Sequence, residues 1–144
     1  MSLPVAFWDA SALIPLCAQQ IQTPRARELY MGFGIAVWWA TPVEIMSGLS
    51  RLKRMGGIGD APFQTGKQRA QALERLWDSV NPAASIVAQA CLLLEIYPLR
   101  AADALQLAAA LGCFDQSPSG HVFITADERL SEAARRTGFS VEFI

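Results

Sequence analysis

The chain has 144 residues, of which 52% are hydrophobic and 17% are charged, and its formal net charge is −1. This composition is typical of a folded domain and excludes an intrinsically disordered tail. The length suits one compact unit, so we expect a single domain over residues 1–144. The mean hydropathy of +0.25 fits either an alanine-rich helical protein or an apolar surface that binds a partner.

The sequence does not predict a membrane span or a zinc site. The most apolar helical stretch, SIVAQACLLLEIY, contains Gln89 and Glu95 and is shorter than the roughly 20 apolar residues that a span needs. The N-terminal apolar run contains Asp9 and follows no basic residue, which makes it a poor signal peptide. No CxxC motif occurs. We expect a cytoplasmic protein whose three cysteines are small buried hydrophobic residues, namely Cys17, Cys91 and Cys113.

Short apolar runs alternate with helical stretches along the chain. We expect strands in VAFWDA, GIAVWWA, HVFIT and FSVEFI, and a very short one at Ser79–Val80. We expect helices in the intervening segments, at residues 11–18, 23–33, 41–55, from 62 or 65 to 77, 82–97, 102–114 and 127–138. Strands that alternate with helices indicate βαβ crossovers. They predict an α/β protein with a parallel sheet covered by helices on both faces.

Small polar residues mark the expected starts of three helices. Ser11, Thr23 and Thr41 are each suited to be N-caps. Pro24 and Pro42 follow two of them, and proline is favoured at the first helical position.

Four acidic residues lie where a parallel sheet forms its sites. Asp9 ends the first expected strand, and Asp127 follows the fourth. Glu44 and Asp103 each lie in the first turn of a helix, and the helix of Asp103 is otherwise apolar. Structural explanations remain open for each of them. Asp9 and Asp127 suit N-caps, Glu44 suits ordinary first-turn charge, and Asp103 suits an ion pair with Arg100 or the helix dipole.

The four carboxylates together predict a different chemistry. If they converge on one rim, their repulsion opposes folding unless a divalent cation offsets it. An all-oxygen ligand set favours Mg²⁺ or Mn²⁺ over zinc. Two such ions about 4 Å apart can activate a water and stabilise a leaving oxygen in phosphodiester hydrolysis. Two divalent ions would also change the formal charge of −1 to a positive one, which suits a nucleic-acid substrate.

Five segments, in this order and at suitable spacing, carry a resemblance that covers nearly the whole chain: FWDASAL, TPVEIMSGLSRL, LRAADALQLAAAL, FITADERL and GFSVEFI. The sequence resembles PIN domains, and specifically the VapC-type ribonuclease toxins of bacterial toxin–antitoxin pairs. The LRAADALQLA run is the most specific part. The resemblance implies a three-layer α/β/α fold with a central parallel sheet of four or five strands. It also implies Mg²⁺- or Mn²⁺-dependent endonucleolytic cleavage of RNA.

The same resemblance implies roles for particular residues and partners. Asp9, Glu44 and Asp103 match the core acidic triad of the family, and Asp127 matches its fourth, more variable acid. Ser11 and Thr125 match the hydroxyl residues that support the metal ligands in the family. The partners implied are a small cognate antitoxin and a second copy of the chain in a homodimer.

A basic stretch offers a second kind of site. Residues 51–75 contain six basic side chains and two acidic ones, a net charge of +4. Such a stretch is either a solvated helix face or a surface that contacts the phosphate backbone of RNA. The candidate RNA contacts are Arg51, Lys53, Arg54, Lys67 and Arg69.

Other functions fit the sequence less well. GDAPFQTGKQ resembles a phosphate-binding P-loop only at Gly66–Lys67. The single histidine, His121, starts a strand, so no nucleophilic pair is expected. A haloacid dehalogenase-type phosphatase would need an aspartate where this chain has Ser11. The alternative from another class is a non-catalytic PIN-like module that binds RNA or protein.

Overall fold

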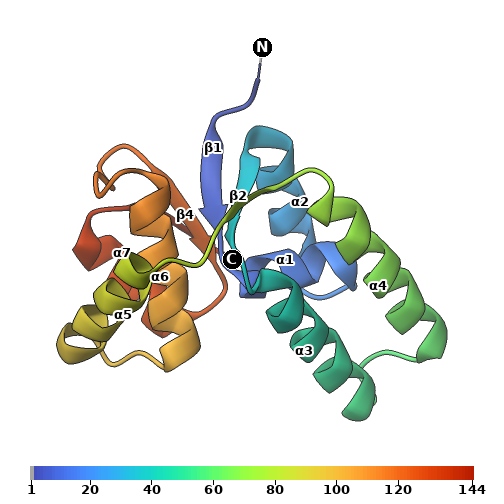
Figure 1. Cartoon of the computed structure of the whole chain (residues 1–144). Helices are drawn as coiled ribbons and strands as arrows, with labels where there is room; N and C mark the ends of the chain where they lie inside the picture. Colours follow the sequence, from blue (N-terminus) through green and yellow to red (C-terminus); the bar gives the residue numbers. More distant parts are fainter. Residues whose placement is uncertain (1) are drawn as a thin grey trace.

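The computed structural model describes residues 2–144. Helices and strands follow one another in the order expected from the sequence (Figure 1). The strands are β1 (Val5–Trp8), β2 (Gly34–Trp38), β3 (Asp78–Val80), β4 (Val122–Thr125) and β5 (Ser140–Phe143). The helices are α1 (Ala10–Cys17), α2 (Thr23–Gly32), α3 (Thr41–Arg54), α4 (Asp60–Glu74), α5 (Ala84–Ile96), α6 (Ala101–Cys113) and α7 (Glu128–Thr137).

The five strands form one parallel sheet in the order β3-β2-β1-β4-β5. Phe7 on β1 is opposite Ala36 on β2 and Phe123 on β4. The chain builds outward from β1 to β3 and then returns to the other side of β1 with β4. The strand order therefore reverses beside β1, which is where ligands bind in open parallel sheets. The prediction of a parallel sheet of four or five strands is confirmed.

Helices cover both faces of the sheet, as Figure 1 shows. Phe7, Trp38 and Phe123 face a core that is completed by α5, α6 and α7. Trp8 and Val37 face the opposite core, which contains side chains of α1, α2, α3 and α4. Successive strand residues point to opposite faces, so each strand contributes to both cores. The predicted three-layer α/β/α fold is confirmed.

Helix α3 lies directly against α1 because residue 48 has no side chain. A Cβ on Gly48 would overlap Cδ1 of Ile14, so the two helices approach each other at this glycine. Ile45 and Leu49 on α3 are buried in the same core. Glu44 is one turn before Gly48, so this contact also positions the helix that carries the Glu44 carboxylate.

The expected N-caps Ser11, Thr23 and Thr41 are wrong. Helix α1 begins at Ala10, ahead of Ser11, and α2 and α3 begin at the two threonines themselves. The Thr23 hydroxyl donates to the Pro15 carbonyl at 2.7 Å, and Thr41 Oγ1 is buried with no hydrogen-bond partner in the part of the chain described here. These hydroxyls are buried by tertiary packing, which local sequence signals do not register.

The cysteines and α5 correct a second expectation. Cys17 is buried, but Cys113 is half-buried and Cys91 is exposed on α5. The helix packs on α6 through Ile86, Ala90 and Leu93, and four of its large apolar side chains are exposed: Val87, Leu92, Leu94 and Ile96. Within residues 2–144 no single helix is long and apolar enough to cross a membrane. Helices α5 and α6 pass that test of length and composition only as a pair bent by 119°.

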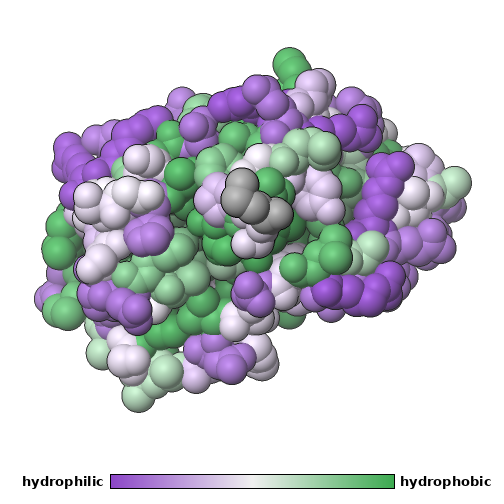
Figure 2. Space-filling model, turned by 90° about the horizontal axis from the view of Figure 1, so that it is seen from above, coloured by the Kyte–Doolittle hydropathy of each residue, from purple (hydrophilic) through white to green (hydrophobic). Residues whose placement is uncertain are grey.

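The amino ends of the strands form a face that is apolar in its middle and hydrophilic along its margins (Figure 2). Leu3 and Val5, which are both exposed, lie at this end of β1. The acidic residues singled out above lie at the carboxyl ends of the strands, at the opposite end of the sheet.

Candidate metal centre at the carboxyl edge of the sheet

Asp9 follows the last residue of β1 and is almost fully buried, with 6% of its surface exposed. Its backbone N–H donates to the Ile124 carbonyl of β4 at 3.0 Å, so its position is fixed by the sheet. Its side-chain Oδ2 accepts hydrogen bonds from the hydroxyls of Ser11 and Thr125, the latter at 2.9 Å. Asp9 occupies the N-cap position of α1, yet its carboxylate makes no cap hydrogen bond and is left to face these two hydroxyls.

Ser11 and Thr125 are themselves held by the backbone after β4. Ser11 Oγ accepts from the N–H of Ala126 at 2.9 Å, and Thr125 Oγ1 accepts from the N–H of Asp127 at 3.0 Å. Because backbone donors occupy the hydroxyl oxygens, both hydroxyl protons are free to point at Asp9. The structure thus brings together Ser11 and Thr125, which the sequence had marked as supporting residues.

Glu44 and Gln106 connect the two helical layers across the end of the sheet. Gln106 lies on α6, with 1% of its surface exposed, and its Nε2 donates to Oε2 of Glu44 on α3. Its other amide atom, Oε1, is buried with no partner among residues 2–144. Gln106 was not among the residues singled out in the sequence. The available signal was a lone amide in the apolar run ADALQLAAAL, one turn after Asp103.

Asp127 is an N-cap, which is the structural alternative that the sequence left open for it. It is the N-cap of α7, and its Oδ1 accepts from the N–H of Leu130 at 2.9 Å. Its charge nevertheless acts on the other acids, because it raises the pKa of both Asp9 and Asp103. The four acids singled out in the sequence therefore share one electrostatic environment, although the Asp127 carboxylate also caps α7.

The remaining three acids all hold their protons more tightly than usual. Burial raises the pKa of Asp9 to about 6, against the lowering effect of its two hydroxyl donors. Burial, followed by the charge of Asp9, raises the pKa of Glu44 to about 7. Burial and the charge of Asp127 raise the pKa of Asp103, while Arg100 offsets part of this effect. Perturbed carboxyl groups of this kind cluster at functional sites.

The expected pairing of Asp103 with Arg100 is absent as a salt bridge from the described part of the chain. Arg100 still lowers the pKa of Asp103, first through its backbone and then through its charge. The Asp103 carboxylate is half-buried without a close counter-ion, which leaves it available to a cation.

The donor atoms fit a hard divalent cation, although the carboxylates are not gathered around one point. The side chains that share the site offer carboxylate, hydroxyl and amide oxygens, which suit Mg²⁺ or Mn²⁺. Burial is the main cause of the raised pKa values of Asp9, Glu44 and Asp103, and the charges of neighbouring acids add to it, so a bound cation would favour the charged forms. Across residues 2–144, no three His, Cys, Asp or Glu side chains already form a group that could hold a metal ion.

The basic candidates lie on α3 and α4, where Lys53 Nζ and Lys67 Nζ are 4.7 and 5.6 Å from the centre of the Phe63 ring. Arg54 and Lys67 line a groove of about 570 Å³ between α3 and α4, together with Val43 and Met46. Lys53 forms a salt bridge with Asp60 at 3.0 Å instead. Of the two remaining candidates, Arg69 lines separate hollows beside α1 and α2, and Arg51 is exposed near the C-terminal end of α3.

Comparison with known proteins gives a family and a fold. The family model of the PIN domain matches residues 6–136. A chain of a toxin–antitoxin complex from Klebsiella pneumoniae is similar in structure, with a TM-score of 0.63 at 19% identity over 88% of this chain and 90% of that one. The protein PAE2754 from Pyrobaculum aerophilum has a TM-score of 0.63 at 17% identity over 96% of this chain and 89% of that one. No curated protein matches the sequence significantly.

Proposed function

The chain belongs to the PIN domain family, and from this premise we propose that it is a metal-dependent endoribonuclease and the toxin of a toxin–antitoxin pair. PIN domains are generally nucleases, and one similar structure is described as a toxin–antitoxin complex. The observation that carries the proposal is the arrangement of Asp9, Glu44 and Asp103 at the carboxyl edge of the sheet, where burial and the charges of neighbouring acids raise their pKa values.

Each residue of the site has a distinct task in this proposal. Asp9, Glu44 and Asp103 would hold Mg²⁺ or Mn²⁺, and Asp127 would contribute through its charge. When bound, the ion supplies a Lewis acid that lowers the pKa of a water and stabilises the leaving oxygen. Ser11 and Thr125 hold the Asp9 carboxylate in place with their hydroxyls, and Gln106 does the same for Glu44 from the opposite layer.

The partners follow from the same proposal. RNA is the substrate, a small cognate antitoxin protein is the inhibitor, and a second copy of the chain completes a homodimer. We assign the homodimer contact to the exposed side of α5, because Glu95 is the only charged residue of that helix and four large apolar side chains are exposed on it. A twofold axis would bring the same apolar helix from each copy together. Three free cysteines are consistent with action in the cytoplasm.

The test is cleavage of total cellular RNA and of transfer RNA by the purified chain with Mg²⁺, with Mn²⁺ and with chelator. We expect cleavage only with metal, and loss of cleavage in Asp9→Asn. Equal cleavage by wild type and Asp9→Asn would mean that the nuclease is a contaminant or that the assignment is wrong. Mapping the new RNA ends after brief expression in cells would identify the substrate.

One observation favours the second candidate, a non-catalytic PIN-like module that binds RNA or protein. No three potential ligands among the described residues are gathered for a metal. If RNA binds but is not cleaved with either metal, and Asp9→Asn binds it equally well, the binding module is the better description.

A further inference from the structure

Trp39 is the one tryptophan of the chain with most of its surface in solvent. It is 57% exposed, whereas Trp8 and Trp38 are buried and Trp77 is half-buried. Tryptophan has a large, rigid aromatic ring. Stacking a flat partner on this ring buries a large apolar area. Val43, close by at the start of α3, is 71% exposed, so the aromatic ring is not isolated on a polar surface.

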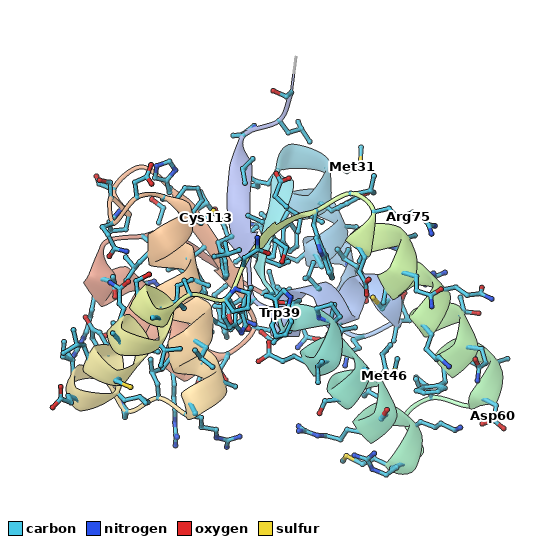
Figure 3. The ribbon with its side chains drawn as sticks, viewed as in Figure 1. Met31, Trp39, Met46, Asp60, Arg75 and Cys113 are labelled. Atoms are coloured by element: carbon cyan, nitrogen blue, oxygen red, sulfur yellow. The ribbon has the colours of Figure 1, made fainter. Side chains whose placement is uncertain are left out.

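The register of the sheet places Trp39 beside the acidic residues. Phe7 is opposite Ala36, so Asp9 is level with Trp38, and Trp39 is one residue farther along the neighbouring strand. Neighbouring strands are about 4.8 Å apart. Figure 3 shows Trp39 at the carboxyl end of the sheet, by the start of α3. Trp38, the last residue of β2, packs on the α5–α6 side, and Trp39 is the first residue of the turn that leads into α3.

The backbone around Trp39 is fixed. Its N–H donates to the Val80 carbonyl of β3 at 3.1 Å, which continues the pairing of β2 with β3 by one residue. The carbonyl of the next residue, Ala40, accepts from the N–H groups of Val43 and Glu44 at 3.0 and 3.3 Å. Trp39 and the carboxylate of Glu44 are therefore carried by one rigid turn, and the ring needs no ordering of a flexible loop before it can bind.

A groove with basic side chains leads away from this turn. The groove between α3 and α4 begins at Pro42 and Val43, three and four residues after Trp39. Farther along the two helices it is lined by Arg54 and Lys67 and by one acidic residue, Glu74. The surface therefore runs from the acidic candidate metal centre to the exposed Trp39 ring and then to the groove that contains Arg54 and Lys67. Aromatic rings stack on unpaired bases, and cations contact the phosphate backbone.

We propose that Trp39 is a positioning residue for this nuclease, and that its ring stacks on an unpaired base next to the scissile phosphate. This inference rests on the proposed nuclease function. In a continuous duplex the base faces are covered by their neighbours, so the ring finds no partner there. Trp39 would hold one base, and with it the neighbouring phosphate, beside the acidic residues.

The test measures RNA binding in an Asp9→Asn background with Mg²⁺, so that the RNA is not cut. The probes are a short fluorescein-labelled single-stranded oligoribonucleotide and its duplex, followed by fluorescence anisotropy. We expect Trp39→Ala to weaken single-strand binding about 5- to 100-fold, because stacking contributes that much per base. We expect Trp39→Phe to recover most of the affinity, Trp39→Leu to recover little, and duplex binding to be unchanged.

Met31→Ala is the matched control, since Met31 is 75% exposed at the other end of the sheet (Figure 3). Equal single-strand affinity of the Trp39→Ala and control proteins would overturn the inference and leave the nuclease proposal standing. Equal loss in Trp39→Phe and Trp39→Leu would also overturn it.

If Trp39→Ala instead changes the mass of the protein in sedimentation, or its affinity for an antitoxin, with RNA binding intact, Trp39 is a protein contact. Failure of the Asp9→Asn protein to bind any RNA, together with no cleavage by wild type, would reject the nuclease proposal itself.

Discussion

Gln106 on α6 donates a side-chain hydrogen bond to Glu44 on α3, and this contact joins the two helical layers across the carboxyl edge of the sheet. The residues are 62 positions apart in the chain. Gln106 is buried, and the bond lowers the pKa of Glu44 against the burial that raises it. The contact therefore both places the Glu44 carboxylate and favours its charged form.

Replacing Gln106 by leucine is expected to reduce cleavage with little loss of stability. Leucine removes the donor to Glu44 and also the unpartnered Oε1, so the change in the free energy of unfolding should be within about 1 kcal/mol. Without the donor the pKa of Glu44 rises further, so the acidic limb of the pH–rate profile should move to higher pH. Gln89→Leu, at a pair of exposed glutamines on the surface, is the control. An unchanged profile in Gln106→Leu would show that the bond does not tune Glu44.

The buried Asp9 carboxyl should make the metal-free protein less stable as pH rises. Its pKa is about 6 in the folded chain against 3.8 ordinarily, so the folded state binds the proton more tightly. This contribution is fully present below pH 3.8 and is lost as pH rises through about 6. A shift of about two units corresponds to at most about 3 kcal/mol. Urea denaturation in chelator should show Asp9→Asn to be the more stable protein at pH 8 and the difference to shrink at low pH. A less stable Asp9→Asn at pH 8 would contradict the burial cost.

Divalent metal should reverse that effect. Mg²⁺ or Mn²⁺ binds the charged carboxylates of the folded state, so it should raise the thermal midpoint of wild type in proportion to the logarithm of its concentration above Kd. Asp9→Asn removes a proposed ligand and should show a much smaller rise. The same rise in both proteins would mean that the ion binds elsewhere. This measurement does not depend on finding the RNA substrate.

The exposed side of α5 should carry the homodimer contact. Leu92 is 59% exposed and the adjacent Cys91 is also exposed, so both lie on that side of the helix. Leu92→Glu places a charge in an apolar interface and should convert a dimer to a monomer in sedimentation velocity. Met55→Glu is the control at an equally apolar exposed position on another element, where 78% of the side chain is exposed. A wild-type chain that is monomeric at high concentration would reject this assignment.

The sheet could be predicted from sequence because its signals are local. Four short apolar or aromatic runs separated by helical stretches are enough to indicate a parallel α/β fold, and the very short β3 was expected at Ser79–Val80. Asp9 and Asp127 were placed at strand ends for the same reason. In a parallel sheet all strand ends of one kind meet at one edge, so chain order alone brings such residues into one region.

The helix caps and Gln106 show where local signals fail. Thr23 and Thr41 have the sequence of N-caps, yet both hydroxyls are buried by packing and neither caps its helix. Gln106 was not singled out in the sequence, because its partner Glu44 is on the opposite layer. No sequence spacing encodes a hydrogen bond between side chains that lie on different faces of the sheet.

The sequence by itself determined the parallel sheet, its order of elements and the acids at its carboxyl edge, since strand periodicity and helix-first-turn positions are properties of neighbouring residues. Only the tertiary structure decided how those acids behave. Burial raises the pKa of Asp9 and Glu44, two hydroxyls and an amide orient them, and α7 takes the Asp127 carboxylate as its cap. Desolvation and hydrogen-bond direction depend on what surrounds a group in space, and α1, α3, α6 and β4 meet at this edge only when the chain has folded.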